Sequence, residues 1–90
     1  MFKIEKLVEG DTTVFQLVGR IDAQQLDELS KLLAEVEGRV NLDLGEVTLV
    51  DLDVIRFLRT QEILGAELAN CSRYIREWIL REQCKLNIST

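Results

Sequence analysis

The 90-residue chain has no histidine and no proline, only two cysteines, and no long apolar run. Without histidine, the side chain that most often acts as a general base or a zinc ligand near neutral pH is missing. Cys71 and Cys84 do not form a CxxC pair, so we expect both thiols to be reduced and unliganded. No stretch approaches the ~18 apolar residues that span a bilayer, and the alternating N-terminus does not resemble a signal peptide. These features predict a cytosolic protein of bacterial type with no membrane insertion.

Basic residues are outnumbered, with 11 against 16 acidic residues and a net charge of −5. Because a nucleic-acid-binding surface needs a basic patch, we do not expect nucleic acid as the main partner. The chain also lacks a GxxxxGK[ST] phosphate loop and a GxSxG elbow, two common signs of nucleotide binding and hydrolysis. We therefore predict one globular domain over residues 1–90 with no catalytic activity and no cofactor.

What the chain does contain is organised around the segment from residue 40 to residue 65. Apolar residues alternate with polar ones at its start, the pattern of a strand with one buried face; they are Val40, Leu42 and Leu44. Gly45 is expected to end this strand. After Asp51-Leu52-Asp53 the apolar period becomes helical, so Asp51 or Asp53 is placed to cap a helix N-terminus. Gly65 is placed to cap its C-terminus.

Two strands and a helix are predicted ahead of this segment. Residues 2–8 and 12–18 alternate, and the Glu9-Gly10-Asp11 turn between them indicates an antiparallel hairpin that residues 19–22 close. Asp22 and Gln25 fit a capping box at the start of a helix over residues 23–37, with Gly38 after it. An apolar stripe with charged residues on the opposite side predicts that this helix covers a sheet.

Beyond Gly65, residues 66–71 predict a short strand, and Ser72 is placed to cap a helix over residues 73–82. Residues 85–88 are consistent with either an edge strand or a frayed end. The predicted order of elements is β-β-α-β-α-β-α. We therefore predict an α/β fold with a four- to five-stranded mixed sheet and helices mainly on one face.

The order of these patterns resembles the STAS family, the sulfate transporter and anti-sigma factor antagonist domain. The segments that carry the resemblance are GRIDAQQLDEL, VNLDLGEVTLVDLDVIRFL and GAELANCS-RYIREWI. The resemblance as a whole spans almost the whole chain, from Val14 to Ile79. In antagonist members of the family, a turn that reads Asp-Ser-Ser-Gly or Asp-Ser-Thr-Gly opens the central helix, and a partner kinase that is also the anti-sigma factor phosphorylates its hydroxyl. Here the turn reads Asp51-Leu52-Asp53-Val54, so the phosphoacceptor is missing and no phosphorylation site is carried over.

The resemblance implies a non-catalytic regulatory module that binds another protein. The implied partner is a kinase-like anti-sigma factor; the alternative is that the chain is a small soluble STAS subunit of a membrane transport complex, whose partner is the transporter ATPase. A homodimer also stays open. The residues that we expect to contact the partner are Asp51, Leu52, Asp53, Arg56 and Phe57.

Asp53 has two interpretations. It either places a permanent negative charge where the family has a regulated one, or it is only a favourable residue at a helix start. Arg56, Arg59 and Glu62 are expected on the outward face of the same helix, either as an ordinary charged face with an Arg59–Glu62 pair or as a docking surface for an acidic partner.

The remaining candidate sites are weaker. Asp43, Glu46, Asp51 and Asp53 are the type of residue that binds Mg²⁺, but acidic residues in turns are more often solvated or capping. Cys71 precedes a predicted helix start, which can lower the pKa of a thiol, although a buried structural cysteine is the commoner outcome. Trp78, one helical turn from Tyr74, is expected in the core and not in an interface. Thr48 is expected to be a solvated loop residue.

Overall fold

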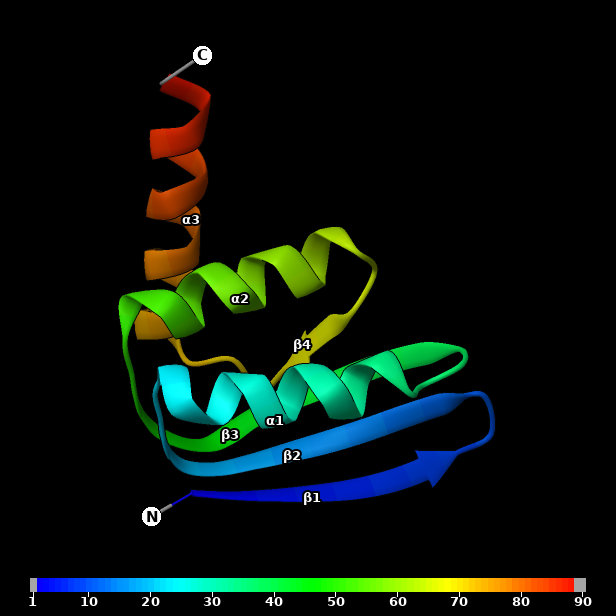
Figure 1. The fold of residues 1–90 in the computed structure, drawn as a ribbon. Helices are drawn as coiled ribbons and strands as arrows, with labels where there is room; N and C mark the ends of the chain where they lie inside the picture. Colours follow the sequence, from blue (N-terminus) through cyan, green and yellow to red (C-terminus); the bar gives the residue numbers. More distant parts are fainter. Residues whose placement is uncertain (1, 89–90) are drawn as a thin grey trace.

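The computed structural model describes residues 2–88, with side chains described as far as Glu82. Its elements in chain order are β1 (Phe2–Glu9), β2 (Thr12–Ile21), α1 (Ala23–Ala34), β3 (Arg39–Val50), α2 (Leu52–Ile63), β4 (Glu67–Ala69) and α3 (Arg73–Ile88) (Figure 1). This is the predicted order β-β-α-β-α-β-α. No helix among these residues is both long enough and apolar enough to cross a membrane.

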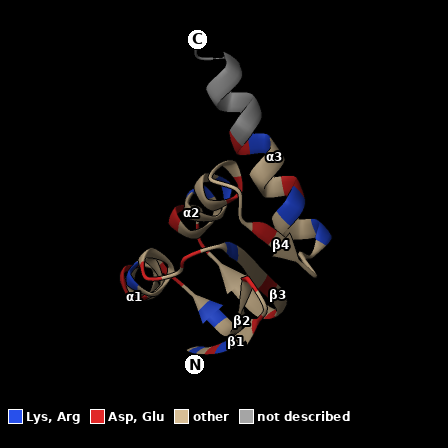
Figure 2. Ribbon diagram, turned by 90° about the vertical axis from the view of Figure 1, so that its right-hand side faces the viewer, with Lys and Arg blue, Asp and Glu red and all other residues tan. Residues whose placement is uncertain are grey.

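The four strands form one mixed sheet in the order β1-β2-β3-β4. β1 and β2 form the predicted antiparallel hairpin, while β3 pairs in parallel with both β2 and β4. Helices α1 and α2 lie on the same face of the sheet (Figures 1 and 2), and α3 packs beside α2. The prediction of an α/β fold with a mixed sheet and helices mainly on one face is therefore confirmed.

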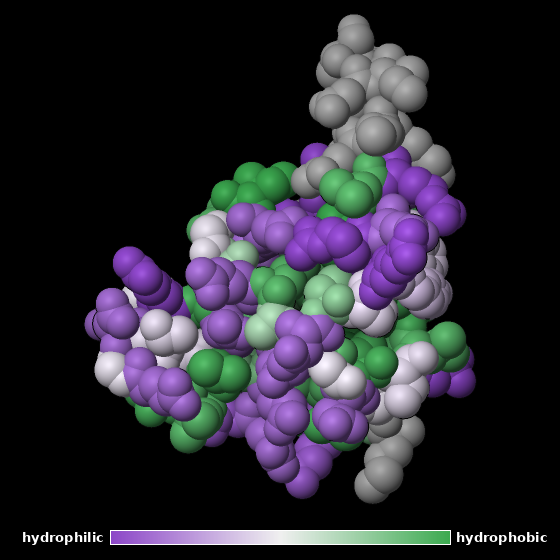
Figure 3. All heavy atoms as spheres, turned by 180° about the vertical axis from the view of Figure 1, so that it is seen from behind, coloured by the Kyte–Doolittle hydropathy of each residue, from purple (hydrophilic) through white to green (hydrophobic). Residues whose placement is uncertain are grey.

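The core lies between the sheet and these helices, because alternate residues of β2 and β3 face the same side. Its buried members are Phe15, Leu17, Ile21, Leu29, Leu42, Leu44, Val50, Val54, Ile55, Leu58, Ile75 and Ile79. Seen from behind, hydrophilic and hydrophobic side chains are interspersed over the described surface (Figure 3). The view from behind therefore does not single out a docking site by hydrophobicity.

Gly45 does not end the central strand, contrary to the prediction. β3 continues to Val50, and its pairing with β2 shifts after Asp43 and again after Val47, where β3 contains one extra residue each time. A bulge leaves one extra residue unpaired and the pairing resumes after it, and glycine in a strand often marks such a site. Residues 19–21 likewise belong to β2 and do not close the hairpin, because they pair with β3. Thr48 is the extra residue of the second bulge and not a loop residue.

The predicted helix caps are confirmed. Asp22 forms the capping box of α1: its Oδ1 accepts the Gln24 N–H at 2.9 Å, and Gln25 Oε1 accepts the Asp22 N–H at 2.9 Å. Ser72 Oγ accepts the Ile75 N–H at the start of α3. Gly65 follows α2 with a φ of 106°, and its N–H is donated to the Glu62 carbonyl, which is a helix-ending conformation that suits glycine.

Three boundaries differ from the prediction. α1 ends at Ala34, three residues earlier than expected, and β4 covers only Glu67–Ala69. α3 continues to Ile88, so residues 85–88 are helical and do not form an edge strand. Apolar periodicity fixes the middle of an element better than its ends, where capping and contacts with other elements decide.

Candidate functional site

The carboxyl ends of β2 and β3 bring two helix starts together. Ile21 pairs with Val50, so the residues that follow them, Asp22 and Asp51, occupy adjacent positions, and each is the N-cap of the next helix. Asp51 Oδ1 accepts the Val54 N–H at 3.0 Å. Asp51 is therefore the capping acid of α2, which the sequence left open between Asp51 and Asp53.

The turn between β3 and α2 exposes an acidic residue and two apolar ones. Asp53 lies in the first turn of α2 with an exposed side chain. Leu52 is 38% exposed, and Leu49, near the end of β3, is 48% exposed. Leu49 was not among the predicted site residues. In the sequence, the one indication of its exposure is that Leu49 and Val50 are neighbours in a strand. Neighbouring strand residues point to opposite faces, so the two cannot both face the core.

The predicted outward face of α2 faces α3 instead. At about 100° per residue, Arg56, Arg59 and Glu62 form one stripe, and α3 packs along it. Arg56 Nε lies 3.3 Å from a Glu82 carboxylate oxygen, and Glu62 pairs with Arg76 of α3 at 3.1 Å.

The predicted Arg59–Glu62 pair is therefore wrong, since the carboxylate of Glu62 binds α3. Arg59 Nε is buried without a hydrogen-bond partner among the described atoms. The interpretation of this stripe as a free docking surface for an acidic partner is wrong as well. Arg56 alone of the three keeps an exposed side chain.

Phe57 points away from this stripe. Its side chain is partly buried and packs against the hydrophobic core. The structure therefore brings together Asp51, Leu52 and Asp53 at the turn, with Arg56 one helical turn further on. Phe57 instead anchors α2 to the hydrophobic core.

The acidic residues considered as a Mg²⁺ site, Asp43, Glu46, Asp51 and Asp53, do not form one cluster. Asp43 lies within β3, where its Oδ1 accepts the Gly45 N–H at 2.9 Å and the Asn70 side-chain amide at 3.1 Å. It thereby ties the first bulge of β3 to the loop after β4. Among the described residues, no group of three or more acidic, cysteine or histidine side chains is placed to hold a metal ion.

Cys71 has the character of a structural cysteine. Its side chain is half-buried, and burial raises the pKa of the thiol; the nearby Arg76 opposes this shift and Glu62 adds to it. A raised pKa keeps the thiol protonated and unreactive at neutral pH. This agrees with the commoner outcome expected from the sequence. The side chain of Cys84 lies outside the described part of the chain.

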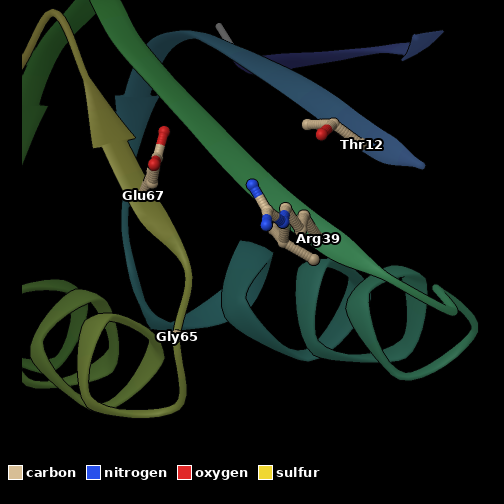
Figure 4. Close-up of a pocket in the computed structure, with 5 residues that line it drawn as sticks. Thr12, Arg39, Gly65 and Glu67 are labelled. Atoms are coloured by element: carbon tan, nitrogen blue, oxygen red, sulfur yellow. The ribbon is translucent and has the colours of Figure 1, made fainter. Parts of the chain in front are cut away.

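A small hollow lies at the opposite end of the strands from the acidic turn. It has a volume of about 220 Å³ and is lined by Thr12, Arg39, Val40, Gly65 and Glu67. Figure 4 shows Arg39 and Glu67 on the neighbouring strands β3 and β4 at this hollow. Both side chains are exposed, and the hollow has no feature that selects one class of ligand.

No family model and no curated protein matches the chain. Among solved structures, the anti-sigma factor antagonist SpoIIAA in its unphosphorylated form is similar, with a TM-score of 0.59 and 18% identity over 86% of this chain and 79% of that one. The crystal structure of Mglu is also similar, with a TM-score of 0.56 and 25% identity over 77% of this chain. The match covers 20% of the Mglu chain, so this protein corresponds to about a fifth of it.

Proposed function

We propose that this chain, whose fold is that of a STAS domain, is a non-catalytic regulatory module that binds another protein. The similarity to an anti-sigma factor antagonist supports the class of function. The observation that carries the location is the turn between β3 and α2, where Leu49, Leu52 and Asp53 are exposed around the capped start of a helix.

The turn has the chemistry of a protein contact. Two exposed leucines supply apolar area that a partner can cover, and the Asp53 carboxylate supplies a charge that selects a basic group on that partner. Asp51 contributes indirectly, because its hydrogen bond to Val54 holds the turn in one conformation. Arg56 lies at the edge of the surface, where Glu82 orients its side chain.

The turn offers no hydroxyl to a kinase, since Leu52 and Asp53 occupy the positions after Asp51. Asp53 carries about one negative charge, against ~1.5–2 for a phosphate. We therefore propose an interaction that is not regulated by phosphorylation of this turn. The proposed partner is a kinase-like anti-sigma factor, and the alternative is a transporter ATPase.

Affinity capture of the tagged protein from its native cells tests this proposal, with partners identified by mass spectrometry. We expect Asp53→Lys to reduce capture of the specific partner at least ~10-fold, the effect of about 1.4 kcal/mol on binding. The matched control is Asp27→Lys, which makes the same charge change at an exposed position of α1 and should leave capture unchanged.

Equal capture by wild type and Asp53→Lys would rule out this surface. Recovery of an anti-sigma factor would support the regulatory module. Recovery of a transporter ATPase with its permease would instead favour the alternative.

A further inference from the structure

Two aromatic rings form a platform on the outer side of α3. Tyr74 and Trp78, the only tyrosine and the only tryptophan of the chain, lie one helical turn apart. Their rings are stacked, with centroids 5.8 Å apart and planes within 11° of parallel. Tyr74 is 51% exposed, so the pair presents aromatic surface to solvent. Trp78 was expected in the core, but its ring is only partly buried there.

The platform borders a hollow on the surface of α3. This hollow has a volume of about 430 Å³, and its described lining consists of Tyr74, Glu77, Trp78 and Arg81. Trp78 packs against the hydrophobic core on one side and against Tyr74 on the other. The rings are therefore ordered before a partner binds, which lowers the loss of side-chain entropy on binding.

The charge available in this hollow is positive. Glu77 already pairs with Arg73 at 3.1 Å, whereas Arg81 is exposed and has no ion pair among the described side chains. Residues 73–90 contain four of the eleven basic residues but only two of the sixteen acidic ones. Figure 2 shows both blue and red bands along the described part of α3. The described part of α3 thus contains three arginines and two glutamates, in a protein whose net charge is −5.

We propose that this face of α3 is a second protein-binding surface, which takes an acidic segment of a partner. An apolar side chain of that segment lies on the rings of Tyr74 and Trp78, and a neighbouring carboxylate pairs with the Arg81 guanidinium. Tryptophan, tyrosine and arginine are the residues that contribute most to protein interfaces, and a guanidinium can bind a carboxylate through two parallel hydrogen bonds. This surface lies on another element than the turn before α2, so the proposal does not depend on the proposed function.

Trp78 provides the readout for a direct test, because a single tryptophan makes the fluorescence of the protein report on this hollow. The probes are short synthetic peptides that place one leucine, proline or phenylalanine between glutamates, and the same peptides with lysine in place of glutamate. We expect saturable changes in Trp78 emission with the glutamate series, with Kd values below ~1 mM. The lysine series should not give a saturable change.

Two variants locate the binding. Arg81→Glu should weaken binding of the glutamate series at least ~10-fold. Lys31→Glu makes the same charge change at an exposed position of α1 and should have no effect. Tyr74→Ala should also weaken binding, and circular dichroism melts would establish that each variant is folded. Asp53→Lys should leave peptide binding unchanged, so failure at one surface is distinguishable from failure at the other.

Three results would overturn the proposal. The first is the absence of saturable binding by the glutamate series, and the second is equal affinity of the wild type and Arg81→Glu. The third is a change in Trp78 emission that follows protein concentration without peptide, together with dimer formation in sedimentation, which would mean that a second copy of the chain covers this face.

Discussion

Asp51 and Asp53 are two residues apart but have different environments. Asp51 precedes α2 with an extended backbone, and its carboxylate accepts the Val54 N–H at 3.0 Å. Asp53 is inside the first turn, where its exposed carboxylate benefits only from the positive end of the helix dipole. One acid therefore shapes the turn, and the other presents a charge to solvent.

Substitution by alanine should separate these two roles. We expect Asp51→Ala to lower the free energy of unfolding by about 1 kcal/mol, because an N–H at the helix start loses its acceptor. Asp53→Ala should lower it much less. Urea denaturation followed by circular dichroism measures both. If the two variants lost equal stability, Asp51 would not be the cap.

At the scale of elements, the loop between α1 and β3 is joined to the hairpin turn between β1 and β2. The Arg39 N–H is donated to the Asp11 carbonyl at 2.9 Å. Gly38, just before it, has a φ of 110°, and a Cβ at this position would lie 2.5 Å from the same carbonyl oxygen. The close approach sets where β3 begins to pair with β2, and only glycine fits there.

Gly38→Ala should therefore be strongly destabilising. We expect a loss of at least ~2 kcal/mol, since strain at a positive φ costs roughly 1–3 kcal/mol and the new methyl group meets backbone. Gly10→Ala is the matched control, because Gly10 has a φ of 62° but open space around its Cβ position. Thermal melts should show the larger drop in Tm for Gly38→Ala; the reverse order would contradict the close contact.

At the scale of the whole molecule, one core supports two separate surfaces. The sheet contributes one face to this core, and α1 and α2 cover it. The acidic turn lies at the carboxyl ends of β2 and β3, whereas the aromatic platform lies on α3. Because all elements share a single core, a substitution that disrupts its centre should unfold both surfaces.

Leu42→Asp tests this dependence. Leu42 is fully buried in β3, and an unpaired buried charge costs several kcal/mol against a total stability of only ~5–15 kcal/mol. We expect this variant to be unfolded by circular dichroism. Leu49→Asp, on the same strand but 48% exposed, should fold and melt cooperatively. A cooperatively melting Leu42→Asp variant would mean that β3 is not the centre of the core.

The sequence by itself determined the order of the elements, the apolar side of most of them and the candidate residues that cap the helices. These features depend on contacts within a few residues, such as Asp22 with Gln25 or Asp51 with Val54. The local periodicity indicates which side chains are buried, and capping residues indicate where a helix starts. The lack of a hydroxyl in the turn was also visible from the sequence alone.

Only the tertiary structure decided which neighbour each face meets. Gly45 continues β3 as a bulge because β2 supplies hydrogen bonds on both sides of it. Glu62 and Arg56 form ion pairs with α3, to Arg76 and Glu82, because packing brings together residues that are 14 and 26 positions apart in the chain. The exposure of Leu49 and of the stacked Tyr74 and Trp78 is likewise decided by long-range packing, because no other described element covers these side chains completely. A sequence pattern marks the side of an element that is polar, but long-range packing determines whether another element covers that side.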